Sequence, residues 1–122
     1  FAEPMIESLL VLLDDLKRRY KIPAANFLGH GDVIPGRKVD PSRLFPWQRL
    51  AERGFGVWCN PPYAPATSRD DALLLAALGY DVTRMDATRA AFRRHYLANE
   101  STAPLTDNER ALLQCLIARK RD

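Results

Sequence analysis

Residues 29–47 of the chain read GHGDVIPGRKVDPSRLFPW, a stretch without helical or strand periodicity in which glycine and proline recur. His30 follows a predicted strand at residues 26–28, and Asp40 comes ten residues later. Imidazole and carboxylate groups are ordinary zinc ligands, and a loop that leaves the strand and returns brings both into one coordination sphere. Lys38 would then supply a cation near an oxygen that becomes negative during attack on a carbonyl. Spacing alone also suits a hydrogen-bonded structural His–Asp pair beside a surface lysine.

The regions around this stretch predict a mostly helical chain in two parts. An amphipathic helix is expected from about Pro4 to Tyr20, with an apolar face broad enough to require an extensive packing partner. A short helix is expected to open at Phe45-Pro46-Trp47 and to end at Gly54. Residues 59–67 are rich in proline and predict a linker, which places a domain boundary between residues 1–58 and 68–122.

Three helices are predicted after the linker. The first takes Ser68 as its N-cap and Gly79 as its C-cap, and the second starts near Asp86. The third begins with Thr106 and Glu109, which have the spacing of a capping box.

The composition is that of a globular protein and argues against nucleic acid as a partner. Of the 122 residues, 47% are hydrophobic and 27% are charged, with a net charge of +3. Residues 1–61 carry nine basic and seven acidic groups (+2) and residues 62–122 carry nine and eight (+1), so neither half is strongly basic. Arg89, Arg93 and Arg94 lie on one predicted helix and leave a helical partner-binding or DNA-binding module as an alternative.

Residues 29–58, GHGDVIPGRKVDPSRLFPWQRLAERGFGVW, closely resemble the zinc-dependent N-acetylmuramoyl-L-alanine amidases that share a fold with peptidoglycan recognition proteins. The family motif reads approximately G-H-x-D-I-A-P-G-R-K-x-D-P-G-x-x-F-P-W. The resemblance implies that His30 and Asp40 are ligands of one zinc ion per complete catalytic domain. It also implies that Lys38 is catalytic and stabilises the tetrahedral intermediate when the amide between N-acetylmuramic acid and L-alanine is cut. Trp47 is a candidate for stacking on a substrate sugar, with a core anchor as the alternative.

The same resemblance implies an α/β fold. Residues 1–58 would form the C-terminal part of an amidase domain, a mixed sheet flanked by helices. Residues 68–122 resemble the small three-helix peptidoglycan-binding module of the periplasmic branch, with the sequence LGYDV at residues 78–82 as a familiar junction. The implied partners are peptidoglycan or muropeptides, and the implied location is the periplasm or cell envelope of a bacterium, with a lipid anchor as an option.

Two functional residues of the family have no match in this sequence. The first zinc-binding His and the general-base Glu would lie before Phe1, and His95, in the second C-terminal helix, is expected to be a solvated surface residue. We therefore expect this chain to be the C-terminal part of a longer enzyme, with weak zinc binding and little activity alone. Either the preceding segment or a second copy would cover the apolar face of the first helix. A non-catalytic peptidoglycan-binding protein, or an inactive fragment of the amidase, is the alternative.

Cys59 and Cys115 are too few for a disulfide framework and too far apart for a CxxC metal site. Two free thiols are the favoured interpretation, with a bridge in an oxidising periplasm as the alternative. The longest strongly apolar stretch, residues 9–13, is too short to span a membrane.

Overall fold

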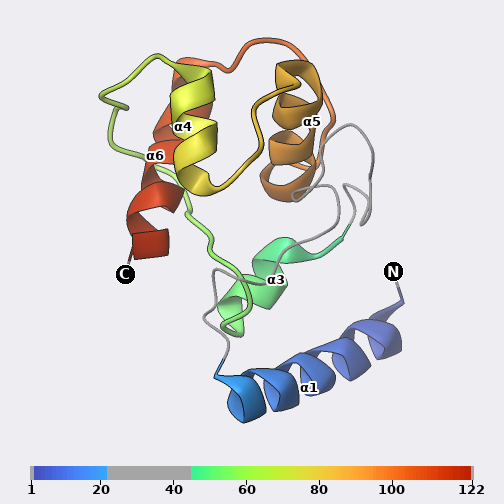
Figure 1. Cartoon of the computed structure of the whole chain (residues 1–122). Coiled ribbons are helices and arrows are strands. Elements are labelled where there is room, and N and C mark those ends of the chain that lie inside the picture. Colours follow the sequence, from blue (N-terminus) through green and yellow to red (C-terminus); the bar gives the residue numbers. More distant parts are fainter. Residues whose placement is uncertain (1, 22–44, 122) are drawn as a thin grey trace.

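The computed structural model describes residues 2–21 and 45–121, and these residues contain five helices (Figure 1). The helices are α1 (Glu3–Tyr20), α3 (Trp47–Glu52), α4 (Asp71–Leu78), α5 (Met85–Tyr96) and α6 (Asp107–Arg121). The described part of the chain is thus mostly helical, as predicted, and contains no strand. The strand predicted at residues 26–28 lies outside the described residues. No helix among the described residues is both long and apolar enough to cross a membrane.

Helix α1 forms where the sequence predicts it, but only part of its apolar face is buried. Pro4 occupies the first turn, where its missing N–H has no helical partner to lose, and three basic residues lie near the negative end of the helix dipole. Ile6 and Leu10 are buried, whereas four other large apolar residues of this helix are 50–69% exposed. These four are Met5, Val11, Leu12 and Tyr20.

Helix α3 packs against α1 through a small apolar core and three polar contacts. The core, here called the N-terminal cluster, consists of Ile6, Leu10, Trp47, Leu50 and Phe55. Arg49 of α3 forms ion pairs with Glu3 and Glu7 of α1. Lys17 Nζ donates a hydrogen bond to the carbonyl oxygen of Gly54, which has a φ of 88° and follows α3 closely. These contacts involve residues from Glu3 to Lys17 of α1, and Figure 1 shows the short helix α3 beside α1.

Helices α4, α5 and α6 share a second and larger apolar core. This C-terminal cluster consists of Cys59, Leu74, Leu75, Leu78, Tyr80, Ala91, Phe92, Tyr96, Leu105, Leu112, Leu113 and Leu116. Trp58 is partly buried against both clusters, so the two cores meet at this residue.

The caps of these helices agree with the sequence in two cases out of three. Gly79 ends α4 with a φ of 115°, and Thr106 and Glu109 exchange the two reciprocal bonds of a capping box at 3.1 and 2.9 Å. The prediction of Ser68 as the N-cap of α4 is wrong. Asp70 caps this helix by accepting a hydrogen bond from the Leu73 N–H, while the Ser68 hydroxyl accepts one from the Asp70 N–H.

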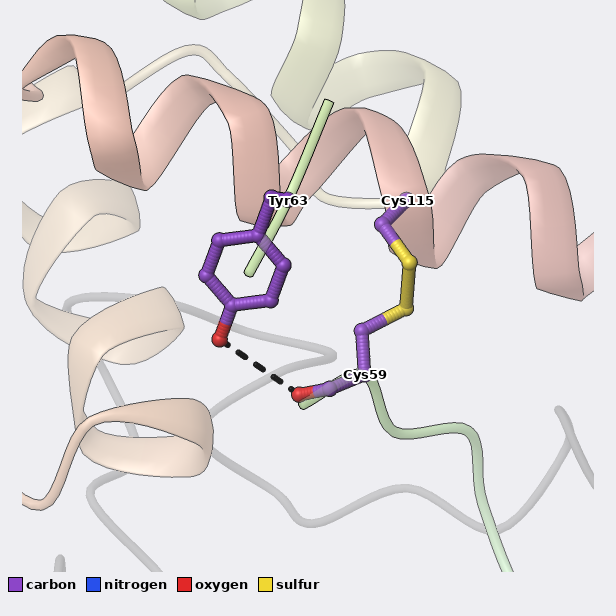
Figure 2. The surroundings of a disulfide bond; sticks show 3 residues. All are labelled: Cys59, Tyr63 and Cys115. Atoms are coloured by element: carbon purple, nitrogen blue, oxygen red, sulfur yellow. Dashed lines mark hydrogen bonds between the residues drawn. A yellow bond between two sulfur atoms is a disulfide. The ribbon is translucent and has the colours of Figure 1, made fainter. Parts of the chain in front are cut away.

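Cys59 and Cys115 form a disulfide, so the favoured prediction of two free thiols is wrong (Figure 2). The bond joins Cys59, in the proline-rich segment at residues 59–67, to the middle of α6 across 56 residues of sequence. The Tyr63 hydroxyl donates to the Cys59 carbonyl oxygen, and the Gln114 side chain accepts two hydrogen bonds from Thr67. Residues 59–67 are therefore fastened to α6 at both ends, at Cys59 and at Thr67.

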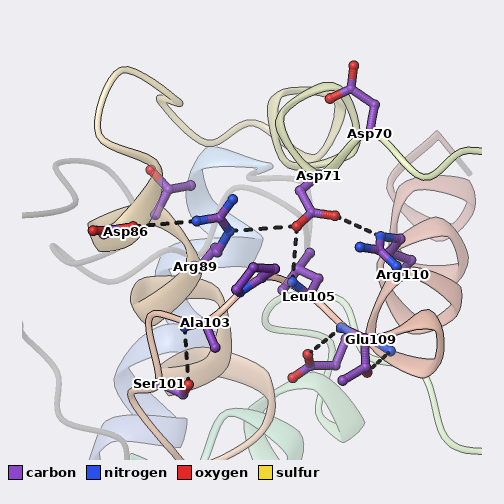
Figure 3. Close-up of polar contacts among 12 residues, drawn as sticks. Asp70, Asp71, Asp86, Arg89, Ser101, Ala103, Leu105, Glu109 and Arg110 are labelled. Carbon is purple, nitrogen blue, oxygen red and sulfur yellow. Dashed lines mark hydrogen bonds and ion pairs between the residues drawn. The ribbon is translucent and has the colours of Figure 1, made fainter.

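A polar network fixes the three C-terminal helices relative to one another (Figure 3). The Asp71 carboxylate of α4 accepts from Arg110 of α6 at 2.7 Å and from the Leu105 N–H at 3.0 Å, and it lies 3.6 Å from Arg89 of α5. Arg93 of α5 is bound by both carboxylate oxygens of Glu109. These hydrogen bonds satisfy charges that burial would otherwise make costly.

The arginines of α5 are engaged inside the protein. Arg93 and Arg94 are only 3% and 7% exposed, and Arg89, Arg93 and Arg94 each pair with at least one carboxylate. A DNA-binding surface needs cations that can reach phosphate groups. The arginines that suggest such a surface are therefore engaged in ion pairs within the fold.

Candidate functional site

The three residues predicted to carry the chemistry, His30, Lys38 and Asp40, lie outside the described residues. Within the described ranges, no three His, Cys, Asp or Glu side chains come together in a way that could hold a metal ion. His30 and Asp40 do offer the right donor chemistry, because neutral imidazole and carboxylate are both common zinc ligands. The structure describes the two helices on either side of these residues, α1 and α3.

The described residues on the two sides of residues 22–44 are in contact with each other. Helix α1 ends at Tyr20, and α3 begins at Trp47. Both helices contribute to the N-terminal cluster and are joined by the ion pairs of Arg49. The chain positions that precede and follow the candidate site residues are thus fixed relative to each other by one small core.

Trp47, the candidate sugar-stacking residue, is a buried residue that joins the two parts of the chain. Its side chain is 6% exposed and belongs to the N-terminal cluster. The indole stacks on the His95 ring of α5, with ring centroids 3.9 Å apart and an interplanar angle of 14°. The Phe45 ring packs on the indole in a tilted arrangement, with ring centroids 4.8 Å apart. The burial agrees with the alternative of a core anchor, and contact with a sugar remains a prediction.

His95 is buried, so the prediction of a solvated surface histidine is wrong. It is 5% exposed and stacks on Tyr96 at 4.1 Å as well as on Trp47. The Tyr96 ring in turn packs against the Trp58 ring, with ring centroids 5.4 Å apart. The imidazole therefore belongs to a row of aromatic rings between α3 and α5. The sequence does not predict this role, because the partner ring lies 48 positions away in the chain.

Comparison with known proteins shows which enzymes the chain resembles. No family model matches the chain. The chain is nevertheless similar, in both sequence and structure, to proteins named as N-acetylmuramoyl-L-alanine amidases.

Two curated relatives carry the sequence match. The chain is 37% identical over 109 residues to the N-acetylmuramoyl-L-alanine amidase AmiD of Escherichia coli (strain K12), in an alignment that covers 80% of this chain and 39% of the relative. It is 37% identical over 50 residues to the 1,6-anhydro-N-acetylmuramyl-L-alanine amidase AmpD of Enterobacter cloacae, covering 41% of this chain and 27% of the relative. The chain thus spans well under half the length of these relatives.

Solved structures of related proteins resemble this chain in fold as well. AmiD from E. coli, in complex with the substrate anhydro-N-acetylmuramic acid-L-Ala-D-gamma-Glu-L-Lys, superposes with a TM-score of 0.78 at 32% identity and covers 93% of this chain and 51% of that chain. AmpDh3 from Pseudomonas aeruginosa superposes with a TM-score of 0.80 at 28% identity, covering 100% of this chain and 55% of that one. A complex of AmpDh3 with anhydromuramic pentapeptide gives a TM-score of 0.79 at 26% identity, covering 98% and 54%.

Proposed function

We propose that this chain is the C-terminal part of a zinc-dependent N-acetylmuramoyl-L-alanine amidase, which hydrolyses the amide between N-acetylmuramic acid and L-alanine in peptidoglycan fragments. The observation that carries the proposal is the motif at residues 29–47, in a chain similar to two named amidases. The complexes of AmiD and AmpDh3 with anhydromuramyl peptides support a muropeptide as the substrate class.

The proposed roles follow from the chemistry of each side chain. His30 and Asp40 would hold one zinc ion, together with a further ligand from outside this chain. When bound, zinc supplies a Lewis acid that polarises the amide carbonyl and makes water acidic enough to attack near neutral pH. Lys38 would donate a charge-assisted hydrogen bond to the carbonyl oxygen as that oxygen becomes negative.

The division of the chain follows the same proposal. Residues 1–58 would complete the catalytic domain, residues 59–67 would link the two parts, and residues 68–122 would form a small peptidoglycan-binding module. A periplasmic or envelope location is supported by the disulfide between Cys59 and Cys115, because such bonds persist in oxidising compartments.

The roles of Lys38 and Asp40 can be separated in the full-length protein by measuring zinc content and turnover together. Asp40→Ala removes a ligand and should abolish both. Lys38→Ala leaves the ligands in place, so zinc content should stay normal while kcat falls by about 10²–10³, the range for loss of one oxyanion donor. Arg18→Ala, which removes an exposed cation elsewhere, should change neither. A Lys38→Ala protein that lost its zinc, or kept its full kcat, would refute the assigned role.

A further inference from the structure

A small pocket lies between the segment that precedes α4 and the start of α6. It encloses about 180 Å³. A cavity of about 150 Å³ is large enough to hold benzene, so this pocket can take a group of the size of one amino-acid residue. Its walls are formed by Pro65, Ala66, Ser68, Arg69, Asp107 and Arg110.

Hydrogen bonds hold both walls of the pocket in place. Beside the first wall, Thr67 donates two hydrogen bonds to the Gln114 side chain of α6, at 2.8 Å from its N–H and at 3.0 Å from its hydroxyl. In the second wall, Arg110 donates to Asp71 of α4 at 2.7 Å and to Asp107 at 3.0 Å. The pocket is thus a fixed part of the fold, and a ligand that enters it has little protein structure to order.

The pocket offers an exposed cation and an exposed anion. The Arg69 side chain has no ion-pair or hydrogen-bond partner within residues 2–21 and 45–121. Arg110 differs, because its Nε and Nη1 atoms already donate to carboxylates. The Asp107 side chain is 82% exposed, and a carboxylate can accept several hydrogen bonds at once. A ligand that carries both a carboxylate and an ammonium group would match Arg69 and Asp107.

The stem peptide of a muropeptide carries both of these groups. In L-Ala-D-gamma-Glu-L-Lys, the peptide part of the ligand in the AmiD complex, the gamma linkage leaves the α-carboxylate of glutamate free. The lysine adds a terminal carboxylate and an ammonium group. Arginine binds a carboxylate through two parallel hydrogen bonds, which are stronger than bonds between neutral groups. The glycan is uncharged once its lactyl group is in amide linkage, so it gives Arg69 no ionic partner.

We propose that this pocket binds the stem peptide of peptidoglycan, with Arg69 pairing with a peptide carboxylate and Asp107 accepting from the ammonium group. The inference rests on the proposed function, because that function makes a muropeptide the ligand class. It assigns to residues 68–122 the recognition of the peptide and not of the glycan.

The test is a nuclear magnetic resonance titration of the full-length protein with the free peptide L-Ala-D-gamma-Glu-L-Lys. This peptide lacks the muramyl amide, so its binding is measured without turnover. Arg69→Ala removes the cation, and Arg69→Lys keeps the charge but loses the two-pronged donor. Arg119→Ala is the matched control, because it removes an exposed cation from the other end of α6. The same peptide with both carboxyl groups amidated is the control ligand.

The free peptide should shift the amide resonances of residues 66–69 and 107–110 in the wild type. Loss of a charge-assisted contact should weaken the binding at these residues by about tenfold in Arg69→Ala. Arg69→Lys should lose about threefold, because the charge remains without the planar fork. Arg119→Ala should bind the peptide as the wild type does, and the amidated peptide should leave these resonances in place.

The titration and the cleavage assay separate the two claims. The inference is overturned by unshifted resonances at residues 66–69 and 107–110, by unchanged binding in Arg69→Ala, or by equal shifts with the amidated peptide. A zinc-supplied wild type that leaves a muropeptide uncleaved would overturn the proposed amidase function. The titration would still decide whether the pocket binds the peptide, because it involves no bond cleavage.

Discussion

Removal of the disulfide between Cys59 and Cys115 should destabilise the C-terminal helices substantially. The bond closes a loop across 56 residues that contains α4, α5 and the first part of α6. The loop-closure entropy lost by the unfolded chain across that separation corresponds to about 4 kcal/mol at 25 °C. Small domains have total unfolding free energies of about 5–15 kcal/mol, so a loss of this size is large. Alanine is the appropriate replacement, since Cys59 is 3% exposed and a serine hydroxyl would be buried there.

The assay is urea unfolding, followed by circular dichroism, of the wild type and of Cys59→Ala/Cys115→Ala. We expect the double variant to lose about 2–4 kcal/mol, since measured effects often fall below the entropic value. Dithiothreitol should destabilise the wild type by a similar amount and leave the double variant unchanged. If the oxidised wild type, the reduced wild type and the double variant unfold within about 1 kcal/mol of one another, the disulfide is not a principal support of this part of the fold.

Three further changes test other parts of the structure by the same unfolding assay. Thr106→Ala removes the capping hydroxyl at the start of α6 and should cost about 1 kcal/mol; an unchanged midpoint would contradict the capping box. Asp71→Ala leaves Arg110 and the Leu105 N–H without their buried acceptor and should cost about 3–5 kcal/mol, whereas a loss below 1 kcal/mol would mean that water replaces the carboxylate freely. The Arg93 hydrogen bond, with smaller help from the Thr106 N–H, holds the pKa of Glu109 below its ordinary value. A carboxyl with a lowered folded-state pKa stabilises the fold above its unfolded pKa, and this contribution is lost as the pH falls through the folded value, so unfolding free energy should fall more steeply on acidification in the wild type than in Glu109→Gln. Equal acid dependence in the two proteins would refute that role for Glu109.

The features that could be predicted from the sequence are those set by neighbouring residues. The capping box of Thr106 and Glu109 and the C-cap at Gly79 depend on spacings of a few residues, and both are confirmed. The sequence pattern places the N-cap of α4 two residues too early, at Ser68 and not at Asp70. Serine and aspartate are both favoured N-cap residues. Only the backbone conformation decides whether the Ser68 hydroxyl or the Asp70 carboxylate faces the free N–H groups at the start of α4.

The features that could not be predicted depend on contacts between distant parts of the chain. Nothing near Cys59 indicates that the linker returns to α6, so the pairing with Cys115 was not determined by sequence. His95 lies between charged and aromatic neighbours and has the local character of a surface residue, yet Trp47 of another helix covers it. The long motif predicts specific roles for His30, Lys38 and Asp40. These three residues lie outside the described part of the chain.

The most direct test of the proposed amidase is the reaction itself. The full-length protein is supplied with zinc and anhydro-N-acetylmuramic acid-L-Ala-D-gamma-Glu-L-Lys, the substrate seen with AmiD, and the products are identified by mass spectrometry. We predict release of the intact peptide with a free L-alanine amine, and no release by Asp40→Ala. Failure of the zinc-supplied wild type to cleave this bond, or full activity of Asp40→Ala, would contradict the account.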